Sequence, residues 1–471
     1  MLRKLTEPYV VGMASRILGQ VISFVSVMVA SRYLDLEIFG TYALAWAAAV
    51  IGNTFIFTGF YQALLRAGDG EQARDTLFWL NAGLGALFGL AILGAGLAVG
   101  GTADPRGLAL IALAPIPFFI APQAWWEALL VRERRVRAAS LYVLAAEVCA
   151  LVTAVVLLAQ GWAVGALVAS RYVAVAVGLA ATGGLVRKLP RLRLSRAVTR
   201  DAARTAVPLW GTTGVHLFQN YGTDLILGAF ANPAVVGAYR GGARIAITAT
   251  DLVLQPLGVL TWSRFTRIEK EAEGLAALRH AWIANMGLAA ALLWPLSATV
   301  ALLAEPLVVT VLDETWLPAA GVVVILSLSR AILFFTALLE PTLTITGYAS
   351  RQFVIRMFGA GSLLLLLMAF ARHGAEAASW AHLASSVLVA GVAIWAMLRA
   401  LELPLAQFVH TFVPGAALTG VTAGIVAATE PLRGATGPGL GLGLSLAAIA
   451  LAWVVMMGVF LKRRMLELPT P

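Results

Sequence analysis

Polar and ionisable side chains recur at helical spacing inside otherwise apolar segments of the chain. Three segments carry such groups: Arg16 and Gln20; His216, Asn220 and Asp224; Arg240, Arg244 and Asp251. These spacings of four and seven residues place the members of a group on one face of an α-helix. In hydrocarbon an ionisable side chain costs roughly 2.5–3.5 kcal/mol, so each group requires a partner or a water-filled cavity.

Arginine is the most informative residue type among the intramembrane groups. Its guanidinium is planar and permanently charged, and it donates paired hydrogen bonds to phosphate oxygens. We interpret the stripes as the lining of a hydrated, partly cationic cavity between two halves of the chain. The residues assigned to this cavity are Arg16, Gln20, His216, Asn220, Arg240, Arg244 and Arg330. The alternative is that they form intramembrane ion pairs, such as Asp224 with Arg244, that only fix helix packing.

Three carboxylates offer a second kind of chemistry. Asp224, Asp251 and Glu340 are candidates for carrying a coupling proton or for coordinating sodium, the usual roles of acidic residues in membrane spans. Glu127, Glu147, Arg171 and Asn285 also fall within apolar segments.

Signals for enzymatic chemistry are missing from the sequence. There is no phosphate-binding loop that ends in Gly-Lys-Ser/Thr, which argues against ATP hydrolysis. One cysteine and five scattered histidines do not predict a metal site. We therefore expect no catalytic residues and no bound cofactor or metal, and we predict a transporter rather than an enzyme.

The composition indicates which elements position these residues. Hydrophobic residues make up 60% of the 471 and charged residues only 12%, too little charge to cover a soluble protein of this length. Apolar runs long enough to cross about 30 Å of hydrocarbon recur from end to end. The predicted spans are 8–31, 40–64, 77–100, 107–131, 139–160, 163–185, 205–231, 237–261, 281–304, 318–345, 353–371, 378–398, 410–428 and 439–461. The predicted fold is an all-α polytopic membrane protein with about fourteen transmembrane helices.

The basic residues predict the orientation of these helices. If the N-terminus is cytoplasmic, 25 of the 34 lysines and arginines fall on the cytoplasmic side and only four on the other, as the positive-inside rule requires. The net charge of +10 is thus a membrane-orientation signal and does not indicate nucleic-acid binding. We predict a bacterial inner-membrane protein whose N- and C-termini are both cytoplasmic.

The most basic interhelical segment, 186–204, divides the predicted helices into two sets of six. The predicted domains are an N-terminal lobe (1–195), a C-terminal lobe (196–400) and two additional helices (401–471). The two lobes share a weak sequence similarity: Gly40-Thr41-Tyr42 and Gly237-Ala238-Tyr239 each lie at the start of the second predicted helix of a lobe. Pseudo-symmetric lobes of this kind are a recurrent plan of transporters.

Three stretches of sequence resemble a known family. They are Ser31 to Tyr42, Asp224 to Phe230 continuing to Val236–Tyr239, and Thr315 to Ala320 followed by Thr346-Gly347. In these stretches and in topology the chain resembles the polysaccharide transporters, or O-antigen flippases, of the MATE-like superfamily. The resemblance implies two six-helix lobes facing a cavity, with two extra C-terminal helices. It also implies Arg16, Arg244, Arg330 and Asp224 as the leading site residues.

The resemblance implies a substrate as well. We expect an undecaprenyl-diphosphate-linked oligosaccharide that moves from the cytoplasmic to the periplasmic leaflet by alternating access, for O-antigen, exopolysaccharide or a related surface polymer. Expected partners are this lipid-linked oligosaccharide and membrane lipids, with a polysaccharide polymerase and chain-length machinery as further candidates. The alternatives are a cation-coupled multidrug exporter of the same superfamily, which would favour an acidic cavity, and a membrane polymerase or ligase, which would need larger periplasmic loops.

Overall fold

The computed structural model describes residues 8–68, 70–270, 274–436 and 438–467. These residues form α-helices, short 3-10 turns and connecting loops, and none of them forms a strand. By packing, the chain divides into two compact units, residues 1–237 and 238–471, which are described separately below. The predicted lobes, with boundaries at 195 and 400, were defined by the repeat of helix topology and not by packing, and they stay a prediction.

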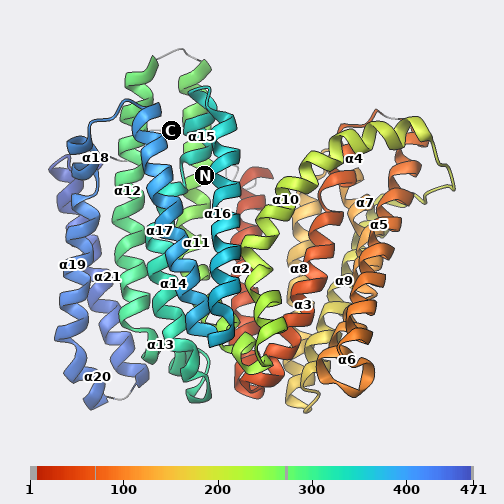
Figure 1. Cartoon of the computed structure of the whole chain (residues 1–471), viewed down its shortest axis with the longest axis horizontal. Coiled ribbons are helices and arrows are strands. Elements are labelled where there is room, and N and C mark those ends of the chain that lie inside the picture. The colour runs from red at the N-terminus through yellow and green to blue at the C-terminus, as the bar shows by residue number, and fades with distance from the viewer. Residues whose placement is uncertain (1–7, 69, 271–273, 437, 468–471) are drawn as a thin grey trace. The chain divides into compact units, whose positions relative to one another are not determined.

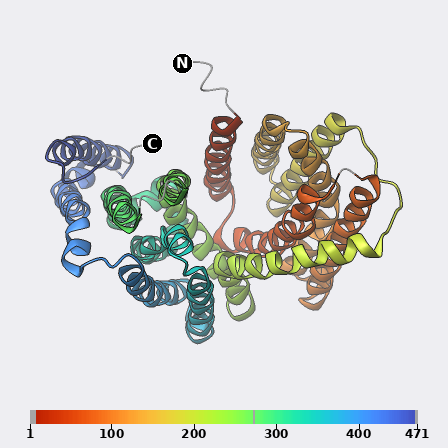
Figure 2. The same cartoon turned by 90° about the horizontal axis from the view of Figure 1, so that it is seen from above.

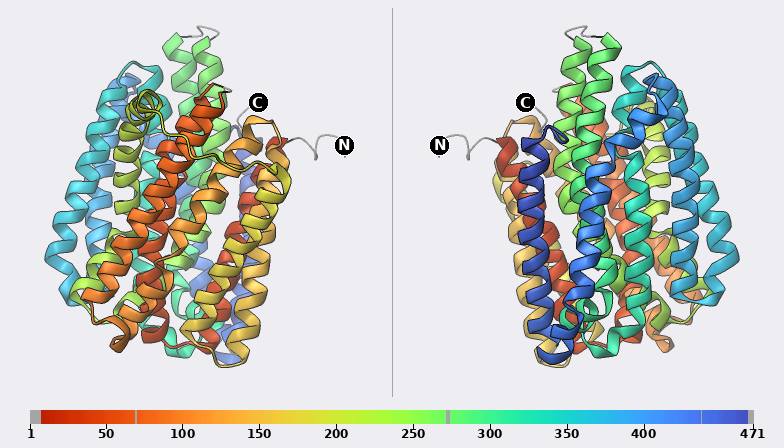
Figure 3. Two further views of the ribbon diagram at one scale, coloured as in Figure 1. Left: turned by 90° about the vertical axis from the view of Figure 1, so that its right-hand side faces the viewer. Right: turned by 90° about the vertical axis from the view of Figure 1, so that its left-hand side faces the viewer.

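Unit 1 is a bundle of long helices that run side by side (Figures 1 and 3). Its helices are α2 (Pro8–Tyr33), α3 (Leu36–Ile56), α4 (Gly59–Arg66), α5 (Glu71–Ala98), α6 (Pro105–Leu113), α7 (Ile116–Arg132), α8 (Val136–Ala159), α9 (Val164–Val186) and α10 (Arg196–Phe230). Helix α10 packs against α3, α4 and α5, so it belongs to this bundle. Proline in the interior of a helix favours a bend, and Pro208 lies inside α10.

Unit 2 is a second helical bundle, and α11 (Pro233–Lys270) connects it to unit 1. Its other helices are α12 (Gly274–Leu302), α13 (Ala304–Val311), α14 (Ala320–Leu333), α15 (Leu339–Ile345), α16 (Ala349–Phe370), α17 (Ala375–Ala400), α18 (Leu405–Thr411), α19 (Val413–Ala428), α20 (Glu430–Thr436) and α21 (Pro438–Lys462). Aromatic rings fill its core, where Trp282, Phe408 and Phe412 pack within one buried cluster.

Eleven helical stretches among the described residues are long and apolar enough to cross a membrane. They coincide with eleven of the predicted spans, and the all-helical, multi-pass membrane fold is therefore confirmed. The remaining predicted spans, 8–31, 205–231 and 237–261, lie in α2, α10 and α11. These three helices carry the polar stripes, and the described part of α2, Leu18–Tyr33, is a shorter apolar helix. The total of fourteen stays a prediction.

A break interrupts the second predicted span. Helix α3 ends at Ile56, and α4 begins at Gly59. Gly59 has a φ of +30°, which glycine adopts more readily than residues with a side chain. The indole of Trp210, from α10, lies beside this break and donates from Nε1 to the carbonyl oxygen of Phe55 over 3.1 Å. A Cβ on Gly59 would lie 2.1 Å from that indole nitrogen. The ring of Trp210 therefore fills the space at the break and adds a donor to a carbonyl oxygen at the end of α3, which also accepts hydrogen bonds from the backbone N–H and hydroxyl of Thr58.

The two Gly-x-Tyr motifs of the sequence meet in the structure. A Cβ on Gly40 would lie 1.8 Å from the carbonyl oxygen of Pro233, and one on Gly237 would lie 2.0 Å from that of Leu36. No side chain fits at either position, so the beginnings of α3 and α11 cross backbone against backbone. Small residues permit such close crossings between membrane helices.

Candidate functional site

The polar stripe of α10 changes from exposed to buried along the helix. His216 and Asn220 are exposed, and the Asn220 amide donates from Nδ2 to the His216 carbonyl oxygen over 2.8 Å. One turn further on, Asp224 is fully buried. The predicted spacing is thus realised on one continuous helix within unit 1.

In unit 2, two of the predicted site residues form an ion pair. Arg330 of α14 contacts the carboxylate of Asp251 of α11 through Nη2, and its Nε donates to the hydroxyl of Thr250 over 2.9 Å. Both charged side chains are about a quarter exposed, at 24% for Arg330 and 25% for Asp251. A guanidinium that is held by a neighbouring hydroxyl is oriented to donate hydrogen bonds to a further oxygen acceptor.

Glu340 has a different environment from the one expected of a buried coupling carboxylate. It lies in α15 and pairs with Arg356 of α16, and both side chains are about half exposed. Its carboxylate is neutralised by an adjacent guanidinium in this conformation.

The other assigned residues remain on the helices that the sequence predicted for them. Gln20 is half-buried on α2, and Arg240 and Arg244 are half-buried on α11. The backbone of Arg16 is helical, whereas its side chain lies outside the part of the chain that the structure describes. The common cavity lined by all of these residues stays a prediction.

Unit 1 contains a half-buried arginine whose partners the sequence did not reveal. Arg171 of α9 donates from Nε to the hydroxyl of Tyr42 over 3.1 Å and pairs with Glu147 over 3.4 Å. Its guanidinium also lies 4.8 Å from the ring centre of Trp46, a cation–π contact. Hydropathy identified Arg171 and Glu147 as ionisable groups within spans, but their pairing depends on the packing of α3, α8 and α9.

Two further clusters place polar side chains inside the bundles. In unit 1, Glu127 accepts hydrogen bonds from the hydroxyls of Tyr61, over 3.1 Å, and Tyr142. In unit 2, the hydroxyl of Tyr239 lies 3.0 Å from Nε2 of His382, and the two rings stack. Tyr61 and Tyr142 carry no charge and gave no signal in the sequence, and the motif that contains Tyr239 did not identify its partner, so these contacts were missed.

Within the described residues, no group of three or more histidine, cysteine, aspartate or glutamate side chains could hold a metal ion. The polar groups described above are arginines, hydroxyls and carboxylates that pair with arginines.

Comparison with known proteins decides the family. Residues 29–321, more than half of the chain, match the model of a family described as polysaccharide biosynthesis protein. The chain belongs to this family. It is also 24% identical, over 405 residues, to the succinoglycan biosynthesis transport protein ExoT of Rhizobium meliloti (strain 1021), with coverage of 81% of this chain and 78% of the relative.

Solved structures share the fold. The lipid II flippase MurJ in an inward closed conformation aligns with a TM-score of 0.74 at 11% identity, covering 97% of this chain and 99% of that one. An inward-facing multidrug resistance MATE family transporter of the MOP superfamily aligns with a TM-score of 0.62 at 14% identity, covering 81% and 95%. The predicted resemblance is confirmed, and the protein is a multi-pass membrane transport protein rather than an enzyme.

Proposed function

We propose that the protein moves an undecaprenyl-diphosphate-linked oligosaccharide from the cytoplasmic to the periplasmic leaflet of a bacterial inner membrane, by alternating access, for surface polysaccharide synthesis. Both termini lie in the cytoplasm in this proposal. The observation that carries it is the family match over residues 29–321, to proteins of polysaccharide biosynthesis. The relative ExoT, a succinoglycan transport protein, and the fold shared with a lipid II flippase support the same class of cargo.

Arginines within the spans supply the chemistry that this cargo needs. A diphosphate is a bidentate anion, and the planar guanidinium matches it better than an ammonium does. In our proposal Arg330 exchanges Asp251 for a phosphate oxygen when substrate enters, while the hydroxyl of Thr250 keeps its guanidinium in place. The pair's partial exposure is compatible with such an exchange. Arg16, Arg240 and Arg244 are the further cationic residues of the proposed site.

The driving ion is part of the proposal. We assign a proton or sodium ion to the predicted carboxylates. Asp251 and Glu340 are each held by an arginine, so ion binding at either position requires that pair to open. Asp224 is fully buried on α10 and is the candidate in unit 1.

The decisive experiment is a deletion strain. Surface polysaccharide is measured together with the pool of lipid-diphosphate-linked oligosaccharide and the leaflet that this pool occupies. Loss of polymer with repeat units trapped on the cytoplasmic side supports translocation by this protein. Intact polymer without a trapped intermediate contradicts it. Complementation with the intact gene is the matched control.

The second candidate is a cation-coupled multidrug exporter. The shared fold with a MATE family multidrug transporter favours it. The arginines within the spans argue against it, because a cationic drug would be repelled. Sensitivity of the deletion strain to cationic dyes, with surface glycan intact, would favour this candidate instead.

A further inference from the structure

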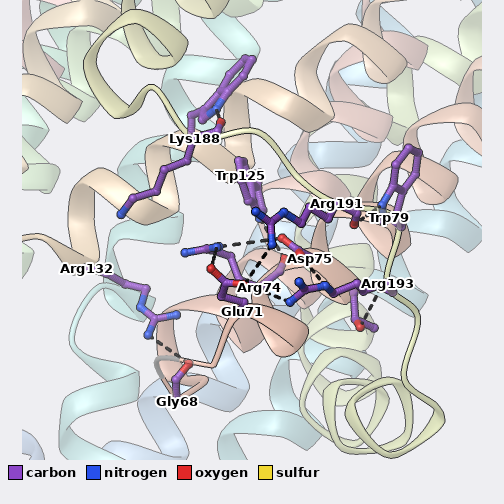
Figure 4. A network of polar contacts seen from close by, with 12 residues as sticks. Gly68, Glu71, Arg74, Asp75, Trp79, Trp125, Arg132, Lys188, Arg191 and Arg193 are labelled. Atoms are coloured by element: carbon purple, nitrogen blue, oxygen red, sulfur yellow. Dashed lines mark hydrogen bonds and ion pairs between the residues drawn. The ribbon is translucent and has the colours of Figure 1, made fainter.

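A short strap, residues 187–195, connects α9 to α10 and lies against the ends of α5 and α7 (Figure 4). Side chains from the bundle bind its backbone carbonyl oxygens: Trp79 Nε1 to Arg191 at 3.0 Å, Trp126 Nε1 to Lys188 at 2.8 Å, and Thr76 Oγ1 to Arg193 at 3.1 Å. The strap is thus held in one shape, although it contains no regular secondary structure.

Ion pairs also connect the strap to the bundle. Glu71, at the start of α5, lies 3.0 Å from Arg193 and 3.7 Å from Arg191. Lys188 donates to Glu133 over 2.8 Å, and this hydrogen bond lowers the pKa of that carboxyl below its ordinary value. The strap therefore remains paired to the bundle at neutral pH.

The leucines of the strap face away from the bundle. Leu189, Leu192 and Leu194 are 80%, 78% and 66% exposed. Each of them directly follows a basic residue in the sequence. Large apolar side chains grouped in this way outside a membrane span mark a surface that is covered in the native environment.

The beginning of α10 continues this surface. Ser195 caps the helix, and Arg196, Arg200 and Arg204 are all exposed, at a spacing of four that places them on one helix face. Ala202 and Ala206, on another face, are buried. Figures 1 and 2 show this part of α10 passing across the ends of other unit 1 helices before it turns along them.

Charge complementarity identifies what covers the surface. Residues 187–204 contain seven basic residues and a single acidic one, Asp201. Exposed leucines beside a basic stripe, at the end of a bundle of membrane spans, match the border between acyl chains and anionic headgroups. We propose that residues 187–204 form an interfacial anchor, which inserts Leu189, Leu192 and Leu194 among the lipids and binds phosphates of anionic phospholipids through Arg196, Arg200 and Arg204.

The position of the strap can be measured directly. The full-length protein with Cys149→Ser and Leu192→Cys carries a single spin label and is placed in nanodiscs of phosphatidylcholine and phosphatidylglycerol. We expect the label to be more accessible to oxygen, which partitions into lipid, than to a water-soluble nickel complex. Greater accessibility to the nickel complex overturns the proposal, whether the strap then faces water or a soluble partner. A label on Gly68→Cys, at an exposed residue that follows α4, is the matched control.

The role of the arginines has a separate test. Arg196→Gln, Arg200→Gln and Arg204→Gln are combined in one variant, and lysine replaces the same three residues in a charge-preserving control. Phosphatidylglycerol binding is measured by native mass spectrometry. Because each basic residue near a membrane surface adds to the attraction, we expect at least about tenfold weaker binding by the glutamine variant than by the lysine variant. Equal binding overturns the proposal. The single-label experiment remains decisive if the glutamine variant does not fold, and neither test depends on which cargo the protein transports.

Discussion

Nε of Arg171 donates a hydrogen bond to the hydroxyl of Tyr42 over 3.1 Å, inside unit 1. A similar contact occurs in unit 2, where the hydroxyl of Tyr239 lies 3.0 Å from the ring nitrogen of His382. Tyr42 and Tyr239 end the two Gly-x-Tyr motifs of the sequence. Each motif therefore supplies a backbone crossing through its glycine and a polar contact to a basic residue through its tyrosine.

Removing the Tyr42 hydroxyl should destabilise the protein. Hydrogen bonds to charged groups contribute about 1.5–3 kcal/mol, so we expect Tyr42→Phe to lower the free energy of unfolding by about that amount. Denaturant unfolding in detergent measures it. Tyr33→Phe, at an exposed tyrosine, is the control and should change stability by less than about 0.5 kcal/mol. Equal stability of the two variants would show that the Arg171 contact is energetically neutral.

The pair of Arg330 and Asp251 can be tested for a role in binding. If Arg330 binds the diphosphate, Arg330→Gln should reduce polysaccharide export at least about tenfold, the factor for roughly 1.4 kcal/mol of lost binding. If Asp251 is only the counter-ion that the diphosphate replaces, and the driving ion binds at another carboxylate, Asp251→Asn should retain export, and exchange of the two residues should not restore it. Membrane insertion of every variant is checked by the amount of protein.

Other outcomes of that series assign other roles. Export lost in Asp251→Asn but kept in Arg330→Gln would place the essential chemistry on the carboxylate, as ion coupling requires. Export restored by exchanging the residues would identify a structural ion pair, because only mutual attraction would then matter.

The crossing of Gly40 and Gly237 predicts an effect of a single methyl group. An alanine at position 40 brings its Cβ against the backbone of Pro233, which cannot move without shifting α11. Overpacking of this kind costs about 1–3 kcal/mol, and a lower melting temperature of Gly40→Ala in detergent would show it. The control is Gly83→Ala in α5, where a Cβ would meet nothing within 4 Å. Glycine is unfavourable in an open helix position by roughly 0.5–1 kcal/mol, so the control should be neutral or stabilising.

The stability of the helix break in the second predicted span should depend on the indole nitrogen of Trp210. Trp210→Phe keeps a ring beside Gly59 but removes one of the donors to the carbonyl oxygen of Phe55, which retains those of Thr58. Loss of one hydrogen bond costs about 0.5–1.5 kcal/mol, which unfolding measurements would detect. Trp162→Phe, at an exposed tryptophan, is the matched control. If both substitutions have the same small effect, the donors of Thr58 are sufficient for this carbonyl oxygen.

Much of the fold could be predicted because hydrocarbon imposes a simple requirement on sequence. A span needs about twenty apolar residues, and the eleven long apolar helices were therefore found at nearly their observed positions. The polar stripes on α10 and α11 were found for the same reason, since an ionisable residue is conspicuous in an apolar segment. Helix breaks were not predicted, because the interruption at Phe57–Gly59 lies within one continuous apolar run and depends on Trp210 from another helix.

By itself, then, the sequence determined the membrane class of the protein, most of its spans and the ionisable residues within them, because hydropathy and charge are local properties. Only the tertiary structure decided which residues are partners. Arg330 with Asp251, Arg171 with Tyr42, and Gly40 beside Pro233 are joined by helix packing across 79, 129 and nearly two hundred residues of chain. The exposure of the strap leucines could likewise be known only from the structure, in which the neighbouring basic residues pair with the bundle. Exposure is a property of the fold and not of the residue.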